Sequence, residues 1–288
     1  MTTRVLVDNC IFSDANMLQG AKLTTYKDRE QTEVSSFIVG YIRKPPLPEK
    51  QARRQNEIDW FPTIAQLSEY EHIKLFTYDE LNFESWFRSV DSKIGNVFSE
   101  SSVTFVEPAI SRSHFRQGDL LEQIRSENKV DFFESLLKWT PDLFQSTEFE
   151  SYLPKLTLDS IKNIDRFKKI AEALTAEQLQ DAFHLWTAEV NDIPYFLTID
   201  FKFINAIRNK AKSKKKPFDM VCEPITPQEL SKKLGIKTPY AYKYSHDEFI
   251  GYGGGTFKIE DYGKPRSKEN GLHRLFKWVR QRVFTTKL

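Results

Sequence analysis

The chain has 288 residues, of which 40% are hydrophobic and 28% charged, and its formal net charge is +2. This composition predicts a globular protein with a sizeable core, and no apolar run reaches the roughly 18–20 residues of a membrane span. With only two cysteines, Cys10 and Cys222, the sequence has no disulfide framework and no zinc-site spacing, so we expect a protein of the reducing cytoplasm.

Charge is distributed unevenly along the chain. Residues 1–200 contain 22 Lys/Arg and 32 Asp/Glu, whereas residues 201–288 contain 20 and 8. An acidic body of −10 is therefore joined to a basic part of +12. Such an asymmetry suggests a polyanionic partner.

The first predicted element is a buried strand at Val5–Val7, a short continuous apolar run that a carboxylate residue ends. Residues 19–60 are largely polar and contain a Pro-Pro pair, so we expect a loop or an irregular helical excursion there. The spacing of apolar residues then predicts a helix around 64–70, a second strand at 73–77 and a helix over 81–87.

Residues 88–154 match no repeat or motif, and we interpret them as an insertion with helical spacing at 131–139. The best-defined helix begins near Thr175, where Thr-Ala-Glu-Gln matches a capping box before an apolar stripe. A turn and Pro194 lead to the strand Tyr195–Ile199, which a second carboxylate ends. Strands that alternate with helices predict an α/β domain with a largely parallel sheet.

Three aspartates are the candidate site. Asp8 and Asp200 each follow a predicted strand, and ligands of open α/β sheets bind beyond these carboxyl ends. Asp181 lies on the capped helix beside Leu185 and Ala188, where a carboxylate needs a partner. Clustered carboxylates are costly to bury unless a cation neutralises them, and hard oxygen ligands suit Mg²⁺ or Mn²⁺. Such a cation could activate water for phosphodiester hydrolysis.

Three stretches of the sequence carry a family resemblance. They are Asp8-Asn9-Cys10-Ile11-Phe12 after the first strand, the helix DAFHLWTA (181–188) with the strand YFLTID (195–200), and VCEPITPQELSKKL (221–234). Together they resemble the PIN (PilT N-terminus) nucleases. The resemblance covers residues 1–18, 64–87 and 165–234, and it implies a three-layer fold with a central, mostly parallel sheet.

In that family the two strand-end aspartates and the helix aspartate bind metal, together with a glutamate of an early helix. Glu84 is our first choice for the glutamate, and Glu80, one turn earlier, is the alternative. The resemblance also implies supporting positions for Asn9, beside the first aspartate, and for Thr198, beside the last. We interpret His184 as a packing residue of its helix rather than as a general base.

A basic run, RNKAKSKKK at 208–216, follows the last strand-end acid and its helix. It is either a solvated loop or a set of phosphate contacts. Residues 272–283 read as a basic amphipathic helix that packs on the core with or without touching nucleic acid, and 251–255 as a Gly-rich loop. The candidate nucleic-acid contacts are Arg208, Lys210, Lys212, Lys214, Lys215 and Lys216.

The sequence therefore predicts a metal-dependent nuclease, and the resemblance favours an endoribonuclease while leaving DNA open. We expect Mg²⁺ or Mn²⁺ as cofactor, nucleic acid as partner, and a protein inhibitor if the chain is a toxin. The predicted nuclease domain is 1–235 with the insertion at about 88–154, and 236–288 is a basic extension. The alternatives are a catalytically inactive module that binds RNA or protein, and an interaction protein in which the insertion does the main work.

Overall fold

The structure is a computed structural model, and it describes residues 2–29, 32–81, 95–115, 126–142, 151–172, 174–213, 218–252 and 255–261. The chain divides into two compact units, which are described separately. Unit 1 comprises residues 1–19 and 44–244, and unit 2 comprises residues 20–43 and 245–288. None of the helices in the described ranges combines the length and the apolar character needed to cross a membrane.

Unit 1 is built around a five-stranded sheet with the order β5-β4-β1-β6-β7, and its four pairings are all parallel. The strands are β1 (Thr3–Val7), β4 (Ile73–Thr77), β5 (Val103–Phe105), β6 (Tyr195–Leu197) and β7 (Glu223–Ile225). The predicted α/β class with a parallel sheet is thus confirmed. Three predicted strands, at 5–7, 73–77 and 195–199, correspond to β1, β4 and β6.

One face of this sheet is covered by short helices from both ends of unit 1. Side chains alternate between the two faces along a strand, so Val5 and Val7 point to the same side. They pack in one apolar cluster with residues of three helices. The three helices are α1 (Asn9–Asp14), α3 (Phe61–Glu69) and α12 (Pro227–Lys233). Helix α2 (Ala52–Ile58) lies against α12.

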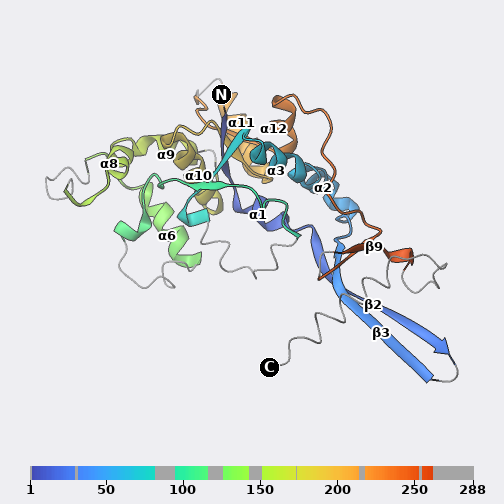
Figure 1. The fold of residues 1–288 in the computed structure, drawn as a ribbon. Coiled ribbons are helices and arrows are strands. Elements are labelled where there is room, and N and C mark those ends of the chain that lie inside the picture. The colour runs from blue at the N-terminus through green and yellow to red at the C-terminus, as the bar shows by residue number, and fades with distance from the viewer. Residues whose placement is uncertain are drawn as a thin grey trace. The chain divides into compact units, whose positions relative to one another are not determined.

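The opposite face carries the larger cluster, in which Leu6 packs with Phe76 and Phe196 of the neighbouring strands. The helices α10 (Leu179–Val190) and α11 (Phe201–Ala211) contribute to it. Helices α6 (Ser126–Leu136) and α9 (Ile164–Ala171) lie against α10, and α8 (Lys155–Lys162) comes between these two in the chain. Helices therefore flank the sheet on both sides, in an arrangement compatible with three layers (Figure 1).

Helix α10 is the central helix of that layer. Thr175 and Gln178 form the predicted capping box at the 3₁₀ turn before it, where the Gln178 amide oxygen accepts from the Thr175 N–H at 3.4 Å. Nine of its twelve residues are buried, because the helix packs on the sheet on one side and on α6 and α9 on others. The capped, apolar sequence thus becomes the helix that carries the mid-helix aspartate.

Two features differ from the sequence pattern. The predicted insertion at about 88–154 contains β5, which is the edge strand of the central sheet beside β4. The region 19–43 is neither loop nor helix, but the two long strands β2 (Leu18–Arg29) and β3 (Thr32–Arg43). β5 pairs with a strand distant in the sequence, so the local pattern did not show it, whereas the apolar stretch FIVGYI (37–42) of β3 was an available strand signal.

Unit 2 is a four-stranded sheet with the order β2-β3-β8-β9 (Figure 1). Its last two strands are β8 (Glu248–Gly251) and β9 (Thr256–Lys258), and β8 pairs antiparallel with β3 and with β9. Residues near the chain's start therefore share a sheet with residues more than 200 positions later. The division into units consequently differs from the predicted boundary at residue 235.

Candidate functional site

The site lies where the strand order of unit 1 changes direction. From β1, the next strands along the chain, β4 and β5, are added on one side of the sheet, and β6 and β7 are added on the other side. β1 and β6 therefore flank a topological switch point. Asp8 directly follows β1, and Asp200 comes three residues after Leu197, the last residue of β6. The Asp8 N–H donates to the Leu197 carbonyl at 2.9 Å. Both acids are thus held at the carboxyl edge, where open α/β sheets bind ligands.

Thr198 connects the two acids. Its hydroxyl donates to Asp8 Oδ2 at 2.6 Å. The Thr198 hydroxyl oxygen in turn accepts from the Asp200 backbone N–H at 3.1 Å. Thr198 is fully buried, whereas Asp8 retains 9% exposure. A single side chain therefore sets the orientation of Asp8 and the position of Asp200, as a supporting residue of a two-carboxylate site would.

Cys10 is a further partner of Asp8 that our sequence analysis did not assign. Its thiol donates to Asp8 Oδ2 at 2.9 Å and lies 3.6 Å from the Thr198 hydroxyl. Burial, and then the negative charge of Asp8, raise the pKa of Cys10 well above its usual value. The thiol consequently stays protonated and serves as a donor. Its position two residues after a helix-capping aspartate was the available signal.

Each carboxylate keeps one oxygen with spare acceptor capacity. Asp200 caps α11, and its Oδ1 accepts from the backbone N–H groups of Lys202 and Phe203 at 2.8 and 3.0 Å. Within the described ranges its Oδ2 accepts no hydrogen bond. Among the described residues, Asp8 Oδ1 accepts a single long contact, at 3.4 Å from the Cys10 N–H. One oxygen of each acid is therefore available to a ligand.

Helix α10 brings Asp181 to the same edge of the sheet. Because α10 ends shortly before β6 begins, it runs antiparallel to the strands, and its first turn lies near their carboxyl ends. Tyr78, which directly follows β4, hydrogen-bonds through its hydroxyl to His184 Nδ1. His184 is 2% exposed and packs against Phe196, in agreement with its interpretation as a packing residue. Asp181 lies one turn before His184 and is half-buried.

These acids do not form a closed metal cage. In the part of the chain that the structure describes, no group of three or more His, Cys, Asp and Glu side chains could hold a metal ion. The donor set still fits Mg²⁺, which commonly binds through one or two carboxylates, several waters and a substrate phosphate. Asp8 and Asp200 supply that pair of carboxylates.

Of the two candidates for a fourth acid, only Glu80 lies within the described residues. Glu84 lies outside the described residues. Glu80 is buried and forms an ion pair with Arg112, whose Nε lies 2.5 Å from Glu80 Oε1. Its carboxylate is therefore already neutralised by a protein cation. Asn9 is 2% exposed at the first position of α1, next to Asp8.

The described part of the basic run is largely occupied by contacts within the protein. Arg208 forms a two-point ion pair with Glu229, at 2.7 and 2.8 Å, which raises the pKa of Arg208. Lys210 donates to the Lys169 carbonyl and has a side chain only 12% exposed. Lys212 is exposed, whereas 214–216 and the predicted helix at 272–283 lie outside the described residues.

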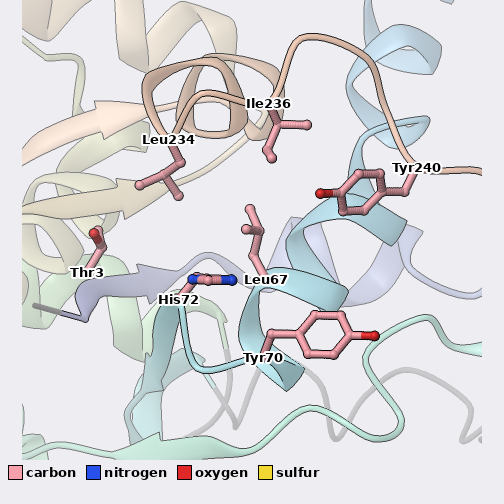
Figure 2. Close-up of a pocket in the computed structure, with 7 residues that line it drawn as sticks. All are labelled: Thr3, Leu67, Tyr70, His72, Leu234, Ile236 and Tyr240. Carbon is pink, nitrogen blue, oxygen red and sulfur yellow. The ribbon is translucent and has the colours of Figure 1, made fainter.

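A cavity of about 320 Å³ lies at the other edge of the sheet (Figure 2). Thr3, at the start of β1, and His72, just before β4, contribute to it. Since these residues mark the amino ends of the strands, the cavity is separated from Asp8 by the length of β1. It does not contribute to the acidic site.

No protein-family model matches the chain, and no curated protein or solved structure matches it either. The resemblance to PIN nucleases therefore stays a prediction. What the structure adds is the placement of two strand-end acids on a common buried threonine.

Replacing Thr198 with valine is expected to weaken Mn²⁺ binding and catalysis by about 10- to 100-fold, the usual effect of losing a residue that orients a metal ligand. Valine has the same shape but lacks the hydroxyl that donates to Asp8. Thr198→Ser keeps the hydroxyl and is the matched control. Titration of both variants with Mn²⁺ tests the role, and equal affinities would contradict it.

Proposed function

We propose that the chain is a divalent-metal-dependent nuclease that hydrolyses phosphodiester bonds at the carboxyl edge of β1 and β6. The observation that carries the proposal is the Thr198 hydroxyl, which donates to Asp8 Oδ2 and accepts from the Asp200 N–H. A buried hydroxyl shared by two strand-end acids at a topological switch point fits a cation-binding pair better than two separate turn residues. The family resemblance makes RNA the expected substrate.

Asp8 and Asp200 would hold the cation with the oxygens that the protein leaves available. Bound Mg²⁺ or Mn²⁺ would lower the pKa of a coordinated water and offset charge on the phosphate. Thr198 and the protonated Cys10 both donate to Asp8 Oδ2, so they orient the carboxylate. The N-terminus of α11 does the same for Asp200 through two backbone N–H groups.

A cationic side chain stacks on the residue that follows Asp200. The guanidinium of Arg53, on α2, stacks over the ring of Phe201 at 3.7 Å from its centroid. Phe201 directly follows Asp200, and Arg53 is exposed. A stacked guanidinium is a strong partner for a phosphate group, because it offers several donors in one plane. Arg53 would thus contact the substrate phosphate without displacing an acid.

The test is cleavage of labelled RNA and DNA oligonucleotides by the full chain with Mg²⁺, with Mn²⁺, or with a chelator. We expect cleavage with either cation and none with the chelator. Binding without cleavage under all metal conditions would instead support the inactive binding module. That alternative is favoured by one observation, the lack of a third acid close enough to complete a metal group among the described residues.

Metal-induced stabilisation separates the acids that share the site. A cation at 100 times its Kd should stabilise wild type by about 2.7 kcal/mol. Asp200→Asn is expected to lose most of this shift and to be more stable than wild type without metal, because its carboxylate and that of Asp8 repel each other. Asp181→Asn is expected to lose a smaller part of the shift, because among the described residues Asp181 completes no metal group with this pair. Thermal melts with and without Mn²⁺ measure it, with the exposed Asp159→Asn as control. A full Mn²⁺ shift in Asp181→Asn would remove Asp181 from the site.

A further inference from the structure

The sheet of unit 2 has two faces of different character. Residues directly opposite in antiparallel strands point to the same side, and alternate residues of one strand do too. Tyr41 pairs with Ile250, and Ile42 pairs with Phe249. Phe37, Val39 and Tyr41 of β3 therefore share one face, and Ile38, Gly40 and Ile42 share the other.

The face that carries Gly40 is packed. Phe249 is fully buried there, and its ring lies 5.2 Å from that of Phe257 on β9. A Cβ at Gly40 would come within 2.7 Å of the Phe249 ring, so the absence of a side chain lets the ring lie against the strand. Phe249 and Phe257 therefore pack on this face, whereas the buried Ile250 lies on the other face with Tyr41.

The face that carries Phe37 exposes aromatic rings to solvent. Phe37 is 58% exposed and Val39 is 39% exposed. Tyr252, just after β8, is 65% exposed, and its ring packs edge-on against Tyr41 with centroids 5.3 Å apart. Exposed large apolar side chains grouped on one face of a sheet mark an interaction surface. We call this group, Phe37, Tyr41 and Tyr252, the aromatic face.

Basic groups accompany the aromatic face. Lys22 on β2 is exposed, and its ammonium lies 4.0 Å from the centroid of the Phe37 ring. Arg43 continues the same side of β3. Lys258 on β9 lies on this side as well, but its ammonium forms an ion pair with Asp247 at 3.4 Å. Over its whole sequence unit 2 contains 13 Lys/Arg and 8 Asp/Glu, a net charge of +5.

We propose that the aromatic face binds single-stranded nucleic acid, with bases stacked on Phe37 and Tyr252 and the backbone phosphates near Lys22. Every base has a flat face that stacks on an aromatic ring, and neighbouring cations attract the phosphates, so rings interleaved with basic side chains fit this ligand. A duplex has its bases already stacked and does not fit. The surface rests on the proposed function and deepens it, because it names the form of the substrate.

The charge favours nucleic acid over a protein partner. An apolar patch meant for a protein commonly excludes charge from its centre. Here an ammonium lies directly over the central ring, where an incoming base can displace it toward the adjoining phosphate. The described basic groups on this face, Lys22 and Arg43, complement phosphates. Most of the other Lys/Arg of unit 2 lie at 264–287, outside the described residues.

The test is fluorescence anisotropy of the full chain with labelled 12-nucleotide oligo(U), oligo(dT) and a 12-base-pair duplex, in a chelator that prevents cleavage. Phe37→Ala and Tyr252→Ala should each weaken single-strand binding by about 5- to 150-fold, the range for loss of one stacked base. Phe37→Tyr should bind like wild type. Lys22→Gln should lower the slope of log K against log salt by about 0.7. Tyr152→Ala, an aromatic residue of unit 1 that is 83% exposed, is the matched control and should not change binding.

Several outcomes would overturn this surface: wild type that binds no oligonucleotide, equal affinity for duplex and single strand, or unchanged binding by both alanine variants. Circular dichroism of each variant shows whether the sheet has folded, and the Phe37→Tyr variant separates stacking from folding. The result is independent of catalysis. Weakened binding in the alanine variants with no cleavage under any metal would keep the surface and reject the nuclease, whereas cleavage with unchanged binding would do the reverse.

Discussion

Asp8→Asn is expected to lower metal-dependent cleavage by at least about 100-fold, more than the loss of a supporting residue costs, while the protein stays folded. Asparagine has the shape of aspartate, and its single amide oxygen can still accept either from Thr198 or from the Cys10 N–H at the start of α1. It lacks the negative charge that a divalent cation requires from a carboxylate ligand. The loss should therefore appear in catalysis and in Mn²⁺ affinity, and not in the circular dichroism spectrum.

The matched control for this prediction is Asp14→Asn, the same substitution at the end of the same helix. Asp14 forms an ion pair with Arg54 at 2.7 Å, in which the two side chains are 22% and 45% exposed. Exposed pairs contribute about 1 kcal/mol or less, so this variant should keep the activity and the stability of wild type. An Asp8→Asn variant that cleaves labelled RNA at the wild-type rate in Mn²⁺ would reject Asp8 as a metal ligand.

The largest loss of stability is expected at the buried ion pair between Glu80 and Arg112. Their side chains are 6% and 4% exposed. Removing one partner leaves an uncompensated charge away from water, so Glu80→Gln and Arg112→Met should each lower the free energy of unfolding by about 3–5 kcal/mol. Urea unfolding at pH 7 measures this, and a loss below 1 kcal/mol would show that the pair is not buried in solution.

A double replacement provides the control. Glu80→Leu with Arg112→Met removes both charges, and the free energy of unfolding should return close to that of wild type, because apolar residues can replace a buried pair. The same variants separate two roles of Glu80. We expect Glu84→Gln to impair cleavage more than Glu80→Gln when both are assayed folded. Lost cleavage in a stable Glu80→Gln variant would instead make Glu80 a metal ligand.

Much of unit 1 could be predicted from the sequence because its signals are local. The apolar run Val5–Val7 and the strand before Asp200 are buried on both faces, so each is apolar throughout and easily identified. The Thr175 capping box marks the start of the helix that carries Asp181. Parallel strands bring their carboxyl ends to one edge, so the proximity of Asp8 and Asp200 followed from the pattern.

The rest depended on contacts between residues far apart in the chain. Arg208 and Lys210 belong to a run that reads as solvated or phosphate-binding. In the folded chain, however, Arg208 forms an ion pair with Glu229, and Lys210 donates a hydrogen bond to the Lys169 carbonyl. Likewise the strands β2 and β3 read as a polar loop, because one face of their sheet is open to solvent. The α/β class and the edge at which the two acids lie follow from the order of local elements along the chain. Which charges are paired and which aromatic rings stay exposed depends instead on folded partners, because pairing and burial involve residues that chain order does not bring together.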